Sequence, residues 1–248
     1  MLDNLTKRRI DNARDILVGI VPDPKAQVEQ ITTALIYKFM DDMDRQSLEL
    51  GGKPHFFAGE FEQYAWPNLM ARSLGGYDRL KLYDEALTRM SSNPNLPKLF
   101  VKIFTDAFLP HRNPETLNLF LKEIDGFTYD HSEQLGDAFE YLLSVLGSQG
   151  AAGQFRTPRH IIDFIVRVLD PDKHERVLDP ACGTGGFLIS AYKHILNKYS
   201  GEEALTPDER ERLKRNFCGY DISPEMVRMS LVNTVSYTHL TLPTIYSV

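Results

Sequence analysis

One stretch near residue 180 limits the possible folds of this chain more than any other feature. Residues 177–187 are VLDPACGTGGF, so a short apolar run ends in an acid and a proline, and three glycines follow within four positions. Glycines clustered after a strand leave bare backbone where side chains would block a ligand. The pattern predicts a short buried strand over 176–179, a glycine loop, and a helix over 187–199.

A second strand and further helices are predicted nearby. Residues 216–221, NFCGYD, predict a strand that ends in the acid Asp221. Thr157, Thr206 and Ser223 each precede a proline, and a capping residue before a proline favours the start of a helix. Strands and helices alternating at these lengths predict a parallel α/β sheet with right-handed crossovers.

The first 147 residues have a different character. Apolar residues at helical spacing predict helices over 28–43, 117–124 and 135–146, and no segment alternates convincingly as a strand. Residues 147–153, GSQGAAG, contain three glycines and mark a domain boundary or a mobile loop. We therefore expect a helical domain before the α/β domain.

Charge and cysteine content limit the setting in which the chain works. The formal net charge is -6, whereas a free-standing nucleic-acid binder is more often basic, so contact with nucleic acid would need a local patch or a partner subunit. Cys182 and Cys218 are the only cysteines, and no secretory segment or apolar run of membrane-spanning length is present. A reducing, cytoplasmic location is predicted.

The two acids after the strands suggest a nucleoside ligand. Asp179 could accept from a ligand amine or amide, and Asp221 could accept from paired ribose hydroxyls. A dinucleotide site fits poorly, because the six-residue fingerprint is absent and the acids are 221 - 179 = 42 residues apart instead of about 20. A glycine turn without any ligand stays open as an alternative.

Four segments in order carry a resemblance to a known family. Residues 179–187 are similar to the first motif of the amino-group, S-adenosylmethionine-dependent DNA methyltransferases, and residues 153–159, GQFRTPR, resemble their G-Q-F-Y-T-P segment. Residues 135–142 resemble the helix that precedes it, and residues 218–227 resemble the ribose-binding motif. Together they resemble the modification (M) subunit of type I restriction-modification systems, over residues 9 to 233.

The resemblance implies a helical N-terminal domain, 1–150, which docks on DNA and the specificity subunit, and the first half of a Rossmann-like methyltransferase domain, 151–233. It implies N6-adenine methylation of DNA with S-adenosyl-L-methionine, in some systems beside a restriction nuclease subunit. Arg156 stands where the family usually has an aromatic residue, so that contact is open. The residues implied to line the cofactor are Gln154, Phe155, Arg156, Thr157, Pro158, Arg159, Asp179, Gly183, Thr184, Gly185 and Gly186, with Asp221 on the ribose.

The family's catalytic [N/D/S]-P-P-[F/Y/W] loop is missing, since the chain contains no Pro-Pro dipeptide. No charged residue follows Arg228, and residues 235–248 resemble a translated sequencing-adapter tail. We therefore expect an inactive N-terminal fragment with a non-native tail over 234–248, against the alternative of a genuine C-terminal strand. Methylation of RNA or protein amides, or a non-catalytic binding module, are the other functions considered, and no metal site is predicted.

Several residues have simpler interpretations than a functional one. Cys182 is expected to fill the loop rather than act as a nucleophile, and Cys218 to pack in its strand. The aromatic residues between Phe56 and Trp66 are expected in a core or interface rather than in a base-stacking platform. The acidic run 41–44 is expected at a solvated helix end. For Arg156, Arg159 and His160, contact with DNA phosphate is an alternative to the cofactor.

Overall fold

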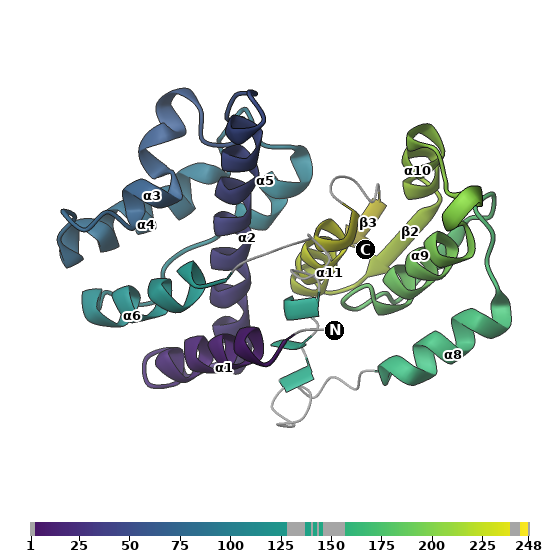
Figure 1. Ribbon diagram of the computed structural model, residues 1–248. Helices are drawn as coiled ribbons and strands as arrows, with labels where there is room; N and C mark the ends of the chain where they lie inside the picture. Colours follow the sequence, from purple (N-terminus) through teal and green to yellow (C-terminus); the bar gives the residue numbers. More distant parts are fainter. Residues whose placement is uncertain are drawn as a thin grey trace. The chain divides into compact units, whose positions relative to one another are not determined.

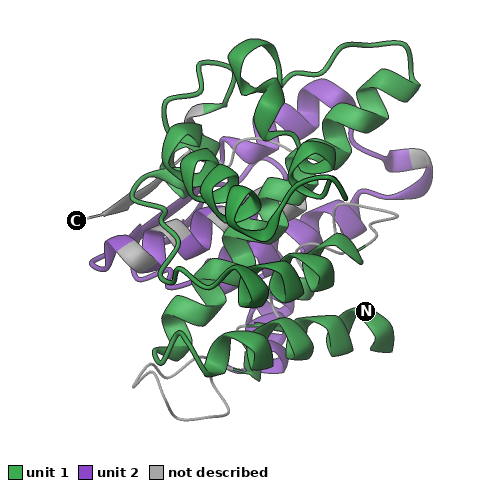
Figure 2. Ribbon diagram, turned by 90° about the vertical axis from the view of Figure 1, so that its left-hand side faces the viewer, with its two compact units in different colours: residues 1–130, 137–153 green, residues 131–136, 154–248 purple. Residues whose placement is uncertain are grey.

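The computed structural model describes residues 3–127, 137–139, 141, 142, 144, 145, 157–238 and 244–247 (Figure 1). It divides into two compact units (Figure 2). The helical unit comprises residues 1–130 and 137–153, and the sheet unit comprises residues 131–136 and 154–248. Within the described parts, no helix is long and apolar enough to cross a membrane.

The helical unit is built around one long helix, α2, which is buried along most of its length. This helix extends further at both ends than predicted. Asp23 caps it by accepting from the amides of Lys25 and Ala26. The described residues within 137–145 are also helical. The elements of this unit are α1 (Asn4–Val18), α2 (Pro24–Glu49), the 3-10 helix η1 (Gly59–Tyr64), α3 (Trp66–Leu69), α4 (Gly76–Met90), α5 (Lys98–Phe104) and α6 (Pro114–Asp125).

The acidic run within α2 is not solvated, so that prediction is wrong. Asp41 and Asp44 are each only 5% exposed. Asp44 accepts from the backbone amides of residues 55–57 at 2.7 to 3.1 Å, and Asp41 accepts from the amide of Trp66 at 2.9 Å. Because α2 continues to Glu49, the acids lie within the helix, where they satisfy the amides of the segment that follows it.

The aromatic residues of that segment form core, as expected. The Tyr37 ring lies 5.2 Å from Phe57 and 6.2 Å from Trp66, measured between ring centroids. Trp66 is 2% exposed, and its indole N–H donates to Asp125 at 2.7 Å. A buried ring with a satisfied polar atom offers no face on which a nucleic-acid base could stack.

The sheet unit confirms the predicted parallel α/β arrangement. Its strands run in the order β1-β2-β3, and both pairs are parallel. Helix α8 packs on α9, while α9 and α11 pack on the strands (Figure 1). Its elements are α8 (Arg159–Leu169), β1 (Val177–Asp179), α9 (Gly186–Lys198), the 3-10 helix η2 (Gly201–Glu203), α10 (Pro207–Lys214), β2 (Phe217–Asp221), α11 (Pro224–Thr238) and β3 (Thr244–Ser247).

The predicted helix starts hold in two of three cases. Thr206 caps α10 in a reciprocal box with Glu209, and the Ser223 hydroxyl accepts from the amide of Met226 in α11. Thr157 does not cap α8, because Pro158 keeps an extended backbone, with φ -56° and ψ 140°, and itself occupies the cap position.

Strand β1 is also less buried than predicted. Leu178 is 60% exposed, and Phe164 and Val168 on the outer face of α8 are 64% and 68% exposed. Within the described residues β1 pairs only with β2, so β1 is an edge strand. This edge of the sheet leaves apolar surface uncovered.

The residues set aside as a non-native tail take part in the described fold. Residues 234–238 continue α11, and Thr244–Ser247 forms β3, with Asp221 opposite Ser247 in the register. The sequence Thr-Ile-Tyr-Ser is rich in β-branched and aromatic residues, which suit a strand added to a free sheet edge. The non-native origin of this segment stays a prediction. Cys218, which was expected to pack in its strand, is partly exposed in β2.

Candidate functional site

The three glycines of the loop between β1 and α9 are needed for different reasons. Gly183 has φ +53° and Gly185 has φ +78°, both in the left-handed region that other residues avoid. A Cβ on Gly183 would meet nothing within 4 Å, whereas one on Gly185 would lie 2.6 Å from the Ser230 hydroxyl. A Cβ on Gly186 would lie 3.1 Å from Ile162 of α8. Bare backbone therefore faces open space at Gly183 and close neighbours at the other two.

The two acids lie at the carboxyl ends of adjacent strands, as predicted. Asp221 joins the loop to its own strand end, since one carboxylate oxygen accepts from the Gly183 amide and the other from the Ser223 amide, each at 2.9 Å. Asp179 accepts from the Ala181 amide at 3.2 Å. Each oxygen of an ionised carboxylate can accept more than one bond, so both acids retain capacity for a ligand.

The environment of Asp179 disfavours its charged form. Burial raises the pKa of the Asp179 carboxyl above its ordinary value, and the nearby charge of Asp221 raises it further, against the opposing bond from the Ala181 amide. An acid with a raised pKa beside a second acid at a strand end is typical of a site that binds a ligand.

Cys182 fills the base of the loop, as expected. Its side chain is 5% exposed, and burial raises the pKa of its thiol to about 11. Its amide donates to the Tyr220 carbonyl of β2 at 2.8 Å, and its carbonyl accepts from the Gly185 amide at 2.7 Å. A thiol with so high a pKa is a poor nucleophile at neutral pH, so Cys182 supports the loop conformation.

Arg159 is held within the protein. Its guanidinium lies 3.3 Å from the Asp163 carboxylate and donates to the Gly186 carbonyl at 3.5 Å. Asp163 also accepts from the Ser190 hydroxyl at 2.5 Å, which ties α8 to α9. Arg159 thereby links the start of α8 to the start of α9, next to the loop.

The remaining predicted positions divide into two groups. Thr157 and Pro158 are exposed and directly precede α8, and His160 is exposed in its first turn. Gln154, Phe155 and Arg156 lie outside the described residues. The structure therefore brings together Arg159, the glycine loop and the two acids.

Sequence reasoning missed Asn233 of α11. Its side chain is 1% exposed and donates from Nδ2 to the Thr184 carbonyl at 2.8 Å. The one available signal was a polar residue at a position that helical spacing places on the buried side of an apolar helix. Among the described residues, no group of three or more His, Cys, Asp or Glu side chains could hold a metal ion.

Comparisons with known proteins show which proteins this chain is similar to. The family model described as N-6 DNA Methylase matches residues 130–237. The type I restriction enzyme EcoEI methylase subunit of Escherichia coli is 29% identical over 227 residues, which cover 86% of this chain and 45% of that protein. The MjaVII methylase subunit of Methanocaldococcus jannaschii is 36% identical over 123 residues, covering 48% of this chain and 21% of that protein.

Solved structures share the fold. The type I restriction-modification system methyltransferase subunit from Streptococcus thermophilus matches with a TM-score of 0.70 and 13% identity, covering 98% of this chain and 58% of that one. A chain from a study of complex assembly and conformational transition of the type I R-M system matches with a TM-score of 0.71 and 23% identity, covering 97% and 50%. The chain thus spans about half the length of the EcoEI subunit and of these two solved chains.

Proposed function

We propose that this chain carries the S-adenosylmethionine-binding part of a type I restriction-modification methylase subunit, because the N-6 DNA Methylase family model matches residues 130–237. The reaction of the whole subunit is methyl transfer to adenine N6 in DNA. The similarity to several type I methylase subunits supports this, and it extends over most of this chain.

The observation that carries the proposal is the carboxyl edge of the sheet. The loop at Gly183 presents open backbone, and the Asp221 carboxylate that holds the Gly183 amide lies at the end of the neighbouring strand. The free amides at the start of α9 favour electronegative ligand atoms. These groups fit a nucleoside with paired hydroxyls at Asp221 and an amino group near Asp179.

When bound, S-adenosylmethionine supplies an electrophilic methyl group on a sulfonium. The residues of this chain would bind and orient it: the loop glycines admit it, Asp221 holds the ribose and Asp179 accepts from its amine. Arg159 keeps α8 beside the loop through its contacts with Asp163 and the Gly186 carbonyl.

The acceptor side of the reaction is served in the family by the [N/D/S]-P-P-[F/Y/W] loop, which this sequence does not contain. Methylating an exocyclic amine requires acceptors that hold the amine and an aromatic face for an extruded base. Without a Pro-Pro loop, we propose that the 248-residue chain binds the methyl donor and does not transfer it.

DNA and a specificity subunit are the proposed partners, in some systems with a nuclease subunit, and the helical unit is their proposed docking region. The net charge of -6 fits a subunit that leaves target choice and much of the DNA contact to a partner. The solved structure concerned with assembly of a type I R-M system supports working in a complex.

Calorimetric titration of the purified chain with S-adenosylmethionine tests the proposal. We expect saturable binding that Asp221→Ala weakens about 10-fold or more, because the variant loses the ribose acceptor and frees the Gly183 amide. Incubation with labelled donor and unmethylated DNA should transfer no tritium. Unchanged affinity in Asp221→Ala would contradict the ribose role, and labelled DNA would contradict the predicted inactivity.

A further inference from the structure

Helix α11 buries polar side chains directly behind the glycine loop. Ser230, Asn233 and Thr234 are 0 to 1% exposed, and their spacing of three and four residues places them on one side of the helix. The other buried residues of the helix include Met226, Met229 and Leu231, which form ordinary apolar core. Polar groups buried in a helix destabilise the fold unless they form hydrogen bonds, so this group calls for a partner.

Thr234 donates to the Leu231 carbonyl of its own helix, whereas the partner of Asn233 is the peptide between Thr184 and Gly185. Asn233 donates to the Thr184 carbonyl at 2.8 Å, while the Gly185 amide donates to the Cys182 carbonyl at 2.7 Å. In a trans peptide the carbonyl and the amide point in opposite directions, so these two bonds hold the peptide from both sides. A rotation of this peptide would break both bonds and move Gly185 away from φ +78°.

Ser230 limits the same peptide from the side. Its hydroxyl occupies the space that a Cβ on Gly185 would need, at 2.6 Å. Helix α11 therefore touches the loop at two successive residues, by a hydrogen bond to one and by close contact with the other.

One atom of the buried Asn233 side chain lowers the stability of the fold. Within the described residues its Oδ1 atom has no hydrogen-bond partner. A buried acceptor without a partner lowers stability, and an apolar side chain of similar size would avoid that penalty. The asparagine is therefore better explained by the bond it makes to the loop than by packing alone.

We propose that Asn233 is a positioning residue that fixes the Thr184–Gly185 peptide, with Ser230 packed against it, so that the loop has its ligand-binding conformation before the ligand arrives. The effect of this positioning on the affinity for S-adenosylmethionine rests on the proposed cofactor function. The hydrogen-bonding role itself can be measured without any ligand.

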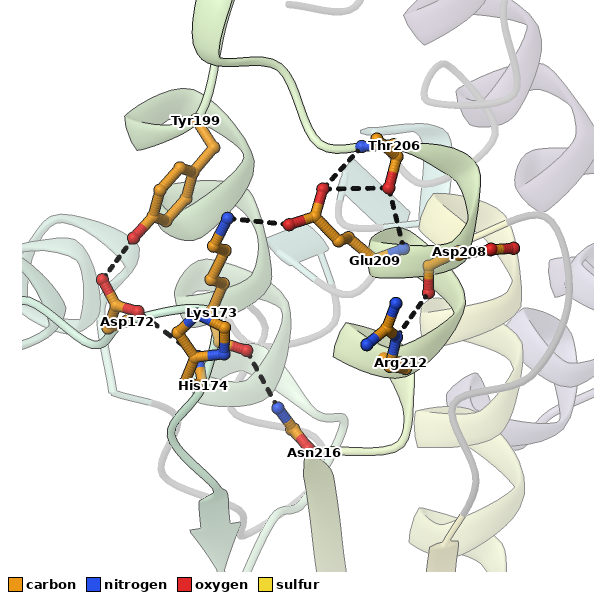
Figure 3. Close-up of polar contacts among 9 residues, drawn as sticks. All are labelled: Asp172, Lys173, His174, Tyr199, Thr206, Asp208, Glu209, Arg212 and Asn216. Carbon is orange, nitrogen blue, oxygen red and sulfur yellow. Dashed lines mark hydrogen bonds and ion pairs between the residues drawn. The ribbon is translucent and has the colours of Figure 1, made fainter.

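The test uses Asn233→Asp in the full 248-residue chain, because an ionised aspartate keeps the shape of asparagine but has no hydrogen to donate. Asn216→Ala is the matched control, since Asn216 donates from Nδ2 to the Lys173 carbonyl at 3.0 Å at the opposite end of the sheet (Figure 3). We expect Asn233→Asp to speed hydrogen exchange at the amides of 183–187 and to weaken S-adenosylmethionine binding about 10-fold.

Asn216→Ala should lower the melting temperature yet leave the loop exchange unchanged and the affinity within about 2-fold. Slow hydrogen exchange at the amides of residues 217–221 reports that the sheet remains folded. If Asn233→Asp unfolds the chain, Asn233→Ala, which also removes the donor, replaces it in the test. Unchanged loop exchange in Asn233→Asp would overturn the proposal, as would equal acceleration in Asn216→Ala.

The two proposals fail separately. If the parent chain binds no S-adenosylmethionine while Asn233→Asp still frees the loop amides, the cofactor function is wrong and the positioning role stands. If the parent chain binds and Asp221→Ala weakens binding, but Asn233→Asp changes neither quantity, the positioning role is wrong and the function stands.

Discussion

The two ends of the sheet in the α/β unit are built in opposite ways. At the amino end, charged and polar side chains from several elements bond to one another (Figure 3). The Lys173 Nζ atom lies 2.9 Å from Oε1 of Glu209 in α10 and 4.6 Å from the centroid of the Tyr199 ring. The Tyr199 hydroxyl donates to Asp172, and Asn216 donates to the Lys173 carbonyl. These contacts join the segments before β1 and β2.

The carboxyl end has glycine where the amino end has long side chains. Its two acids, Asp179 and Asp221, accept from backbone amides, and Gly183 faces open space. One end is closed by side-chain contacts between elements, while the other leaves backbone and carboxylates accessible. We propose that the amino end contributes stability and that the carboxyl end contributes binding.

The largest expected effect is at Gly185. A Gly185→Ala substitution puts a Cβ at φ +78° and 2.6 Å from the Ser230 hydroxyl. We expect a loss of about 2–4 kcal/mol in the free energy of unfolding, from backbone strain plus overpacking, and no measurable cofactor binding. Denaturant unfolding and calorimetry measure both.

Gly183→Ala is the matched control. Gly183 has φ +53°, but a Cβ at this position would meet no atom within 4 Å. Only backbone strain, of about 1–2 kcal/mol, should therefore lower the free energy of unfolding. Its effect on binding should exceed its effect on stability, because the new methyl group would project into the ligand space. Equal stability losses at the two glycines would show that α11 does not press on the loop.

Residues whose signal is local could be predicted from the sequence, and residues whose partner is distant could not. The acid Asp221 follows from strand pattern and position, and the cap at Thr206 follows from its own neighbours. Asn233 bonds to Thr184 across 49 residues, and Asp44 bonds to amides 11 to 13 residues away. Periodicity shows that such residues lie on a helix, but only the packed fold shows which polar group meets which.

Asp179 should show opposite effects on stability and binding. Because its pKa is raised in the folded state, its charge destabilises the fold above that pKa, and the cost disappears as the pH falls below the ordinary value of 3.8. Asp179→Asn keeps an acceptor for the Ala181 amide but removes the charge. We expect a slightly higher melting temperature at pH 7 and roughly 5- to 20-fold weaker cofactor binding.

Thermal unfolding of both proteins from pH 7 to pH 4, with calorimetry at pH 7, measures these effects. The stability difference should shrink as the pH approaches 3.8, where the parent acid is also protonated. A variant that is less stable at pH 7 and binds equally well would assign Asp179 to structure instead of binding.

The smallest effect is expected at the amino end. Lys173→Met removes the ion pair with Glu209, whose pKa is lowered to about 2, first by the bond from Lys173 and then by the bonds from Thr206. A lowered carboxyl pKa stabilises the fold above the ordinary value of 4.5, and that contribution is lost as the pH falls through about 2. Because both side chains of the pair are partly exposed, at 22% and 32%, solvent screens the interaction. The melting temperature at pH 7 should therefore fall by no more than about 3 °C, and by less in about 1 M salt. Arg212→Met, which removes a contact within α10 alone, is the control and should change less still. Faster exchange at residues 183–187 or weaker cofactor binding in Lys173→Met would show that the two ends of the sheet are coupled, against the separation of roles inferred from their chemistry.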